Sequence, residues 1–353
     1  MSQPNAITEE QVREQLRRVR YPGFSRDIVS FGIIKAVEIA SNGRDVTVFI
    51  SIATNQPAIP QQINAEAEAA LRALPGVGSV DLRFDIQNPI TSTTGAGPNR
   101  IDGVRHVLAV ASGKGGVGKS TVAANLAVAL ATAGARVGLC DCDLYGPSIG
   151  LMFGAREPAT ATEDERINPI EAHGVRLMSM AFLLGSDDSP AILRGPMVTK
   201  YTQQFLRRVA WGELDYLVLD LPPGTGDIQL TIVQTVALSG AVIVTTPQEV
   251  ALIDARKATS MFAKTNVPVL GIVENMSYFV SPDTGKRFDI FGVGGGRREA
   301  ARLRVPLLGE IPIDIPTREA GDRGCPVVAA EPEGVVGKAF TDIAERLVRT
   351  LPL

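Results

Sequence analysis

From Gly103 onward, short apolar segments alternate with longer stretches of helical composition, and this alternation constrains the fold more than any other feature. The segments read RHVLAVAS, RVGLCDCD, DYLVLDLP, GAVIVTTP and PVLGIVEN. Apolar residues at nearly every position indicate strands covered on both faces, and strands that alternate with helices indicate a parallel sheet. The sequence therefore predicts an α/β fold with a doubly wound, mostly parallel sheet. We expect the polar motifs that follow the strands to gather at one edge of that sheet.

The N-terminal part has a different pattern, which predicts a small α+β domain. Thr8 and Gln11 have the spacing of a capping box, ahead of a helix expected to end near Tyr21. The β-rich runs FGIIKAVEIA and DVTVFISI flank Asn42 and Gly43, a strong hairpin signal. A helix over QQINAEAEAALRAL and a strand over SVDLRFDI complete the predicted order α-β-β-α-β.

Composition changes again between these two patterns and predicts the domain boundaries. Residues 87–102 read QNPITSTTGAGPNRID, rich in Pro, Gly, Ser, Thr and Asn without periodicity, which is typical of a flexible linker. The small domain is then expected to span residues 1–86 and the large domain residues 103–353.

Overall composition excludes several classes of function. A net charge of -3 leaves no broad basic surface, which argues against nucleic acid and membrane surfaces as partners. No apolar run reaches the roughly 20 residues that span a bilayer, and the N-terminus is polar, so we expect a cytoplasmic protein. Three cysteines are too few for a disulfide framework, and two histidines exclude a histidine-rich metal centre.

The stretch SGKGGVGKST, at residues 112–121, follows a predicted strand and precedes a predicted helix, the context that makes a G-x-x-x-x-G-K-[ST] phosphate-binding loop credible. Glycines let backbone N–H groups surround a phosphate, Lys119 can reach the β and γ phosphates, and Ser120 would bind Mg²⁺. The predicted nucleotide-binding residues of the loop are Gly113, Lys114, Gly115, Gly116, Val117, Gly118, Lys119, Ser120 and Thr121.

Carboxylates follow two further strands. Asp220 closes the strand YLVLD ahead of LPPGTGD, which predicts a second Mg²⁺ ligand and places Gly224 near a γ phosphate. Asp141 and Asp143 in CDCDLYGPS end another strand, where two carboxylates can order the waters of Mg²⁺ and the attacking water. ATP and Mg²⁺ are therefore the predicted substrate and metal.

Taken in order, the motifs SGKGGVGKST, DCDLYGPS, LRGPMV, DLPPGTGD, VTTPQEVALIDARK and ENMSYF resemble those of the Mrp/ApbC family. This family comprises iron-sulfur cluster carrier P-loop ATPases with a deviant Walker A loop, within the MinD/ParA-like superfamily. The N-terminal domain, with YPGFSRDIVSFG, resembles the small iron-sulfur assembly domain fused in front of such ATPases. The resemblance implies a P-loop NTPase domain, ATP hydrolysis, a homodimer and delivery of clusters to apo-proteins.

The resemblance also assigns roles to individual residues. It implies that Lys114 reaches across a homodimer to the phosphates of the partner subunit, as an arginine finger does. By the same resemblance, Asp143 would orient the attacking water. The expected catalytic residues are therefore Lys114, Lys119 and Asp143. Asn275 in ENMS would hydrogen-bond to adenine.

One segment departs from the family pattern. Where members that hold a bridging cluster have C-x-x-C, this chain has Ser281 and Thr284, whose hydroxyls are poor ligands for iron-sulfur clusters. Cys140 and Cys142 are interpreted as small buried side chains beneath the nucleotide site. Cys325, in a Gly/Pro-containing turn, is the remaining candidate ligand.

Three functions therefore remain open. The favoured one is an ATP-hydrolysing iron-sulfur cluster carrier. An ATP-dependent scaffold or adaptor that has lost cluster binding would explain the missing cysteines. A nucleotide-switched positioning protein like the partition ATPases would need a basic or amphipathic tail, whereas the C-terminal helix EGVVGKAFTDIAERLVRTL is expected to pack on the core.

Overall fold

The computed structural model divides the chain into two compact units, Met1–Ala96 and Gly97–Leu353, here the small and the large unit. The predicted linker falls mostly on residues 88–99, and the motif LRGPMV on residues 193–198, both outside the described residues. The described residues are 7–22, 27–30, 32–53, 58–87, 100–143, 146–162, 166–182, 206 and 208–353.

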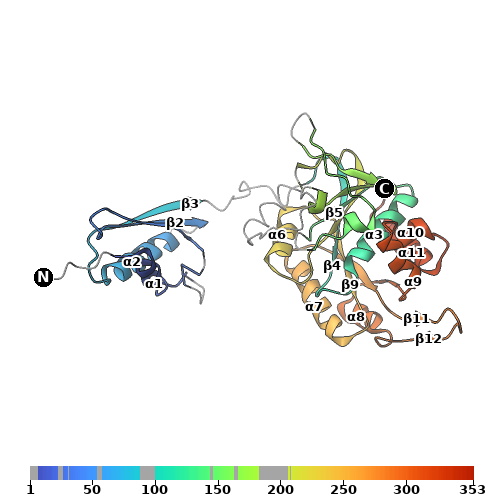
Figure 1. Ribbon diagram of the computed structural model, residues 1–353. Helices are drawn as coiled ribbons and strands as arrows, with labels where there is room; N and C mark the ends of the chain where they lie inside the picture. The colour runs from blue at the N-terminus through green and yellow to red at the C-terminus, as the bar shows by residue number, and fades with distance from the viewer. Residues whose placement is uncertain are drawn as a thin grey trace. The chain divides into compact units, whose positions relative to one another are not determined.

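In the small unit the order α-β-β-α-β is confirmed. Strand β1 pairs antiparallel with β2, and β3 pairs parallel with β2, giving the sheet order β1-β2-β3 (Figure 1). Asn42 shapes the hairpin between β1 and β2, because its side-chain oxygen accepts hydrogen bonds from the N–H groups of Arg44 and Asp45. The elements are α1 (Glu9–Leu16), β1 (Ile34–Ile39), β2 (Val46–Ala53), α2 (Ala58–Arg72) and β3 (Val80–Gln87).

Helix α1 begins as expected but is shorter. Thr8 and Gln11 form the predicted capping box. The helix ends at Leu16, not near Tyr21, because the chain tightens into a turn in which the Val19 N–H donates to the Leu16 carbonyl at 3.1 Å. This turn carries Val19 and Tyr21 into the core of the small unit.

The large unit is built on a sheet of eight strands in the order β13-β10-β9-β4-β8-β5-β7-β6. All neighbours are parallel except β6 and β7, so the predicted mostly parallel sheet is confirmed. The five strands predicted from sequence are β4, β5, β8, β9 and β10. The strands are β4 (Val104–Ala111), β5 (Val137–Asp141), β6 (Ile170–Ala172), β7 (Val175–Met178), β8 (Leu214–Asp220), β9 (Gly240–Thr245), β10 (Val269–Glu274) and β13 (Leu307–Glu310).

Helices cover both faces of this sheet (Figure 1). Helices α3, α10 and α11 lie on one side, and α6, α7 and α8 on the other. A short hairpin of β11 (Phe279–Val280) and β12 (Arg287–Phe288) follows β10. The helices are α3 (Lys119–Thr132), α4 (Ile149–Met152), η1 (Met180–Phe182), α6 (Asp227–Thr235), α7 (Glu249–Lys264), α8 (Gly295–Leu303), α9 (Ile315–Asp322), α10 (Val327–Ala330) and α11 (Val335–Thr350).

The C-terminal helix α11 packs on the core, as expected. Val336, Phe340, Ile343 and Leu347 are all buried, in contact with α3 and β13, while Leu351 is half-buried. Helix α3 is consequently covered by the sheet on one side and by α11 on the other, which explains its apolar composition all round. Among the described residues, no helix is both long and apolar enough to cross a membrane.

Candidate functional site

The phosphate loop, residues 112–121, joins β4 to α3 and is fixed by close backbone contacts. A Cβ atom added at Gly113 would lie 2.1 Å from the backbone of Asp254, so only glycine lets the loop touch helix α7. Gly116 and Gly118 have φ angles of 79° and 80°, in the left-handed region that favours glycine. The loop thus has the backbone conformation in which successive N–H groups can surround an anion.

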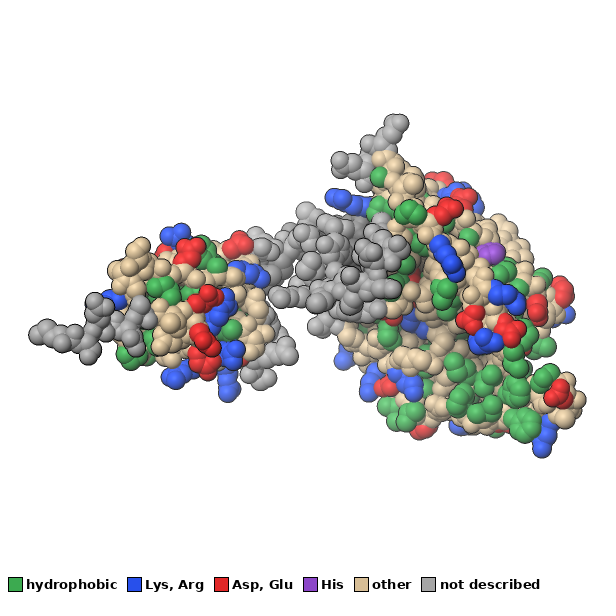
Figure 2. Space-filling view, viewed as in Figure 1, with side chains coloured by type: hydrophobic (Ala, Val, Ile, Leu, Met, Phe, Trp, Pro, Cys, Tyr) green, Lys and Arg blue, Asp and Glu red, His purple; other side chains and the backbone are tan. Residues whose placement is uncertain are grey.

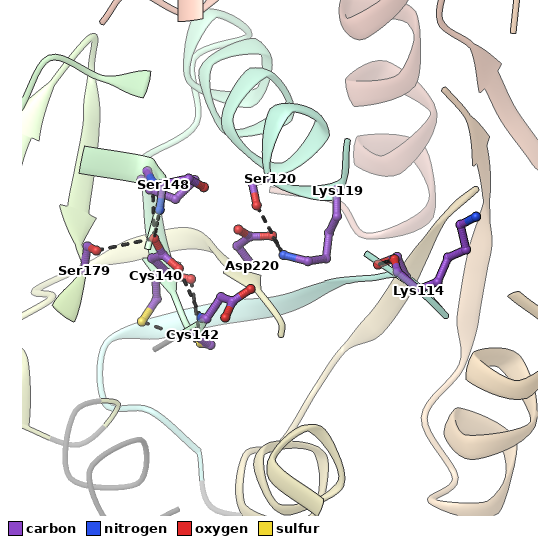
Figure 3. Close-up of polar contacts among 12 residues, drawn as sticks. Lys114, Lys119, Ser120, Cys140, Cys142, Ser148, Ser179 and Asp220 are labelled. Atoms are coloured by element: carbon purple, nitrogen blue, oxygen red, sulfur yellow. Dashed lines mark hydrogen bonds and ion pairs between the residues drawn. The ribbon is translucent and has the colours of Figure 1, made fainter. Parts of the chain in front are cut away.

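Lys119, the first residue of α3, forms a buried ion pair with Asp220 at the end of β8 (Figure 3). The Lys119 Nζ lies 2.5 Å from Asp220 Oδ1 and 3.3 Å from Ser120 Oγ, with the two charged residues 6% and 0% exposed. Burial raises the pKa of Asp220, and the Lys119 ammonium opposes this. Asp220 Oδ2 has no hydrogen-bond partner among the described residues, so a buried carboxylate oxygen beside a hydroxyl is available to a divalent cation.

Asp141, at the end of β5, organises the segment that carries Asp143. Its Oδ1 accepts a hydrogen bond from the Asp143 N–H at 3.1 Å, and its Oδ2 accepts from the Ser148 N–H at 2.9 Å and from Ser179 Oγ at 3.3 Å. Burial, followed by the negative charge of Asp220, raises the pKa of Asp141 to about 7. Asp141 therefore positions its neighbours as well as adding charge to the site.

Two neighbouring cavities open around the loop. The smaller, about 250 Å³, brings together Lys114, Lys119, Ser120, Thr121 and Asp143, as the sequence predicted for residues at one sheet edge. The larger, about 480 Å³, is mostly apolar and shares part of its lining with the smaller one. Shared lining residues are Gly118, Thr121 and Met152, and the larger cavity adds Asn275, Met276, Phe291, Ile313, Val327 and Phe340 among others. One cavity thus suits phosphates and the other an apolar ring.

Lys114 lines the smaller cavity, and Gly224 directly follows Pro223, another of its lining residues. The Lys114 side chain extends away from the Lys119–Asp220 pair (Figure 3), and within the described part of the chain it forms no ion pair. Gly224 has a φ angle of 90° and its N–H donates to the Ser112 carbonyl at 3.0 Å, which ties the segment after β8 to the phosphate loop.

Asn275 and its neighbour Glu274 show a contact that sequence reasoning missed. Asn275 Nδ2 donates to the Val117 carbonyl at 2.9 Å, so the residue touches the phosphate loop as well as lining the larger cavity. Glu274 is fully buried and accepts hydrogen bonds from Ser277 Oγ and from the Gly296 N–H. The only sequence signal was a charged residue closing the apolar strand PVLGIVEN.

The three cysteines differ in their surroundings. Cys140 and Cys142 are buried, with their Sγ atoms 3.9 Å apart, and the hydrogen bond to Cys140 together with burial raises the pKa of Cys142. Their interpretation as buried packing residues is confirmed. Cys325 is half-buried, between α9 and α10, beside Pro326 of the larger cavity. The described residues contain no group of three or more His, Cys, Asp or Glu arranged to hold a metal ion.

Ser281 and Thr284 lie in the turn of the β11–β12 hairpin, where the Thr284 N–H approaches Ser281 Oγ at 3.4 Å. The surface around them is apolar: Figure 2 shows hydrophobic side chains gathered over the hairpin and the start of α8. Exposed apolar residues here are Val280, Phe288, Ile290 and Val293. The hairpin therefore presents hydroxyl and apolar groups at the position where cluster-binding family members have the two cysteines of C-x-x-C.

The parallel sheet, the glycine loop between β4 and α3 and the carboxylate at the end of β8 define a P-loop NTPase fold. Residues 103–348 match the family described as NUBPL iron-transfer P-loop NTPase, and residues 9–82 match the iron-sulfur cluster assembly protein family. The chain belongs to the NUBPL iron-transfer P-loop NTPase family, which confirms the resemblance found in its motifs.

Similar proteins agree with this assignment. The iron-sulfur cluster carrier protein of Deinococcus radiodurans is 50% identical over 348 residues, covering 95% of each chain. The Escherichia coli protein of the same name is 44% identical over 292 residues, 82% of this chain and 79% of that one.

Two solved structures resemble the large unit, and one of them was determined with a bound nucleotide. A nucleotide-binding protein from Archaeoglobus fulgidus in complex with ADP is 41% identical, with a TM-score of 0.60 over 68% of this chain and 93% of that one. The cell division ATPase MinD of Pyrococcus furiosus, 24% identical with a TM-score of 0.54 over 69% and 99% of the two chains, shares the fold.

Proposed function

We propose that this chain is a homodimeric, Mg²⁺-dependent ATPase that carries iron-sulfur clusters and delivers them to apo-proteins. The observation that supports it most is the phosphate loop with Lys119 held beside Asp220 and Ser120. The relatives are named iron-sulfur cluster carrier proteins, which supports an iron-sulfur cluster as the cargo.

ATP would occupy the two neighbouring cavities. The phosphates would lie against the loop amides, the N-terminus of α3 and Lys119, because these groups supply positive charge without a large reorganisation. The base would enter the larger, apolar cavity, where the Asn275 side chain hydrogen-bonds to the loop. The ADP complex of the Archaeoglobus relative supports this assignment by its similarity alone.

Ser120 and Asp220 are the residues we assign to Mg²⁺, and Asp141 would order the waters bound to the ion. Bound Mg²⁺ would neutralise charge on the phosphates. Asp143 lines the phosphate cavity and is held by its N–H bond to Asp141, so its carboxylate would orient the attacking water and accept its proton.

Lys114 is the residue that makes a dimer necessary in this proposal. Its side chain points away from the phosphates that Lys119 of the same chain would bind (Figure 3). A second copy placed against this edge would receive Lys114 at its own phosphates, where an added positive charge stabilises the transition state.

The iron-sulfur cluster is cargo in this proposal. A specific observation favours the second candidate, an ATP-dependent scaffold: the β11–β12 hairpin carries Ser281 and Thr284 in place of cysteines. Cys325 is the remaining candidate thiol, and two copies would offer only two such thiolates.

Anaerobic reconstitution with iron and sulfide separates the two candidates. A carrier should retain iron with visible absorption, lose part of it in Cys325→Ser, and pass it to an apo-protein acceptor. A scaffold should bind ATP yet retain no iron, and this result would refute the carrier function. The double variant Ser281→Cys/Thr284→Cys should bind iron more tightly than the unmodified chain, because four thiolates from two hairpins can then converge.

A further inference from the structure

We propose that Asn275 is a positioning residue for the phosphate loop, holding the peptide between Val117 and Gly118 in the conformation that receives phosphates. The inference rests on the proposed function only in taking this loop as the nucleotide site. It gives Asn275 a structural task at the loop, separate from any contact with a base.

The contact itself is direct and buried. Asn275 Nδ2 donates to the Val117 carbonyl at 2.9 Å, and both residues are nearly inaccessible to solvent. A Cβ atom added at Gly118 would lie 2.2 Å from the same Nδ2, so the amide lies directly against the glycine backbone. The peptide cannot rotate without breaking this bond or colliding with the amide.

The turn that carries Asn275 is itself firmly held. The Asn275 N–H donates to the Thr245 carbonyl at 2.8 Å, which ties the turn to the end of β9. Met276 has a φ angle of 53°, an unfavourable conformation for a residue with a side chain, and such strain persists only where the surroundings enforce it. Asn275 therefore projects from a fixed support at the end of β10.

This arrangement matters for binding because Lys119 follows Gly118 directly and begins α3. A loop whose amides are already turned toward the site avoids the ordering cost that a mobile loop would incur when phosphates bind. A buried carbonyl left without its donor is also unfavourable in itself, so loss of the amide should loosen the loop.

Asn275 also lines the larger cavity, so weaker ATP binding alone would not identify its task. Inorganic tripolyphosphate makes the distinction, because it has phosphates but no base. If Asn275 only recognised adenine, its replacement would leave tripolyphosphate binding unchanged.

Two variants remove the donor without adding charge: Asn275→Leu keeps the approximate size, and Asn275→Ala removes the side chain. Ser277→Ala is the matched control, because it breaks a hydrogen bond in the same turn without touching the loop. Two measurements are made on the full chain: hydrogen exchange of loop amides 112–120 without ligand, and displacement of a fluorescent ATP analogue by ATP or tripolyphosphate.

We expect both Asn275 variants to exchange the loop amides faster than the unmodified chain and to bind tripolyphosphate about tenfold more weakly, the effect of one buried hydrogen bond. Ser277→Ala should lower the melting temperature but leave both loop measurements unchanged. Unchanged loop exchange in both Asn275 variants would overturn the proposal. So would weaker ATP binding with unchanged tripolyphosphate binding, or equally fast loop exchange in Ser277→Ala.

The proposed nucleotide site is tested separately with Lys119→Ala. If that variant binds ATP and tripolyphosphate as the unmodified chain does, the nucleotide site is refuted. Loop exchange in the Asn275 variants still decides the positioning role, because it needs no ligand.

Discussion

Replacing Lys119 by methionine should strongly destabilise the large unit, because it leaves Asp220 as a buried charge without its partner. With the two side chains 6% and 0% exposed, water cannot take over the role of either. Breaking a buried ion pair on one side typically costs about 3–5 kcal/mol, whereas removing both charges together is often nearly neutral. The single variants Lys119→Met and Asp220→Asn should therefore both be less stable than the double variant.

The size of the loss should depend on pH. The folded-state pKa of Asp220 is already raised by burial, and removing the Lys119 ammonium, which lowers it, raises it further. A carboxyl group whose pKa is raised on folding contributes stability at low pH, and this is lost as pH rises through the folded pKa. Lys119→Met should consequently be closer to the unmodified chain at pH 5 than at pH 8.

Tryptophan fluorescence isolates the relevant transition. The chain has a single tryptophan, Trp211, which is fully buried in the large unit, so its signal reports unfolding of that unit alone. In urea, a loss of about 3 kcal/mol lowers the midpoint by roughly 1 M or more. The reasoning fails if Lys119→Met has the midpoint of the unmodified chain, or if the double variant is no more stable than either single one.

Two further predictions concern the phosphate loop. Lys114→Ala should leave ATP affinity intact and lower the hydrolysis rate by a factor of about 10³. Mixing it with Asp143→Ala should restore activity, because each mixed dimer has one complete composite site. No recovery at any mixing ratio would contradict action across a dimer. Gly113→Ala should lower the unfolding free energy by about 1–3 kcal/mol, because its Cβ would collide with the backbone of α7. Gly115→Ala, whose added Cβ would lie 4.0 Å from Pro223 Cβ, is the matched control for stability and should unfold like the unmodified chain.

Contiguous features were predictable from the sequence, and contacts between distant segments were not. The strand, loop and helix around Lys119 are a local pattern, and Asp220 was found because it closes an apolar strand. By contrast, the bond between Asn275 and Val117 joins residues 158 positions apart, and no local pattern reports it. The early end of α1 escaped prediction for the same reason, since the Val19 carbonyl accepts a hydrogen bond from the Ile28 N–H, a contact with a later segment that helical periodicity does not report.

Short strands were also missed. Strands β6, β7 and β13 have three or four residues each, too few for a periodic signal, and their place in the sheet depends on neighbours elsewhere in the chain. In the candidate site, the four groups that donate hydrogen bonds to Asp141 come from the segments after β5 and β7. The sequence therefore placed the charges of the site correctly at one edge but gave no account of what holds them there.

The ion pair between Lys119 and Asp220 makes anion binding an exchange reaction. A phosphate that engages the Lys119 Nζ has to compete with a carboxylate oxygen 2.5 Å away, so the measured affinity is the difference between two strong attractions. The carboxylate that is displaced gains capacity for a divalent cation at the same moment. Phosphate and cation should therefore favour each other's binding, and either one alone should bind more weakly than the pair.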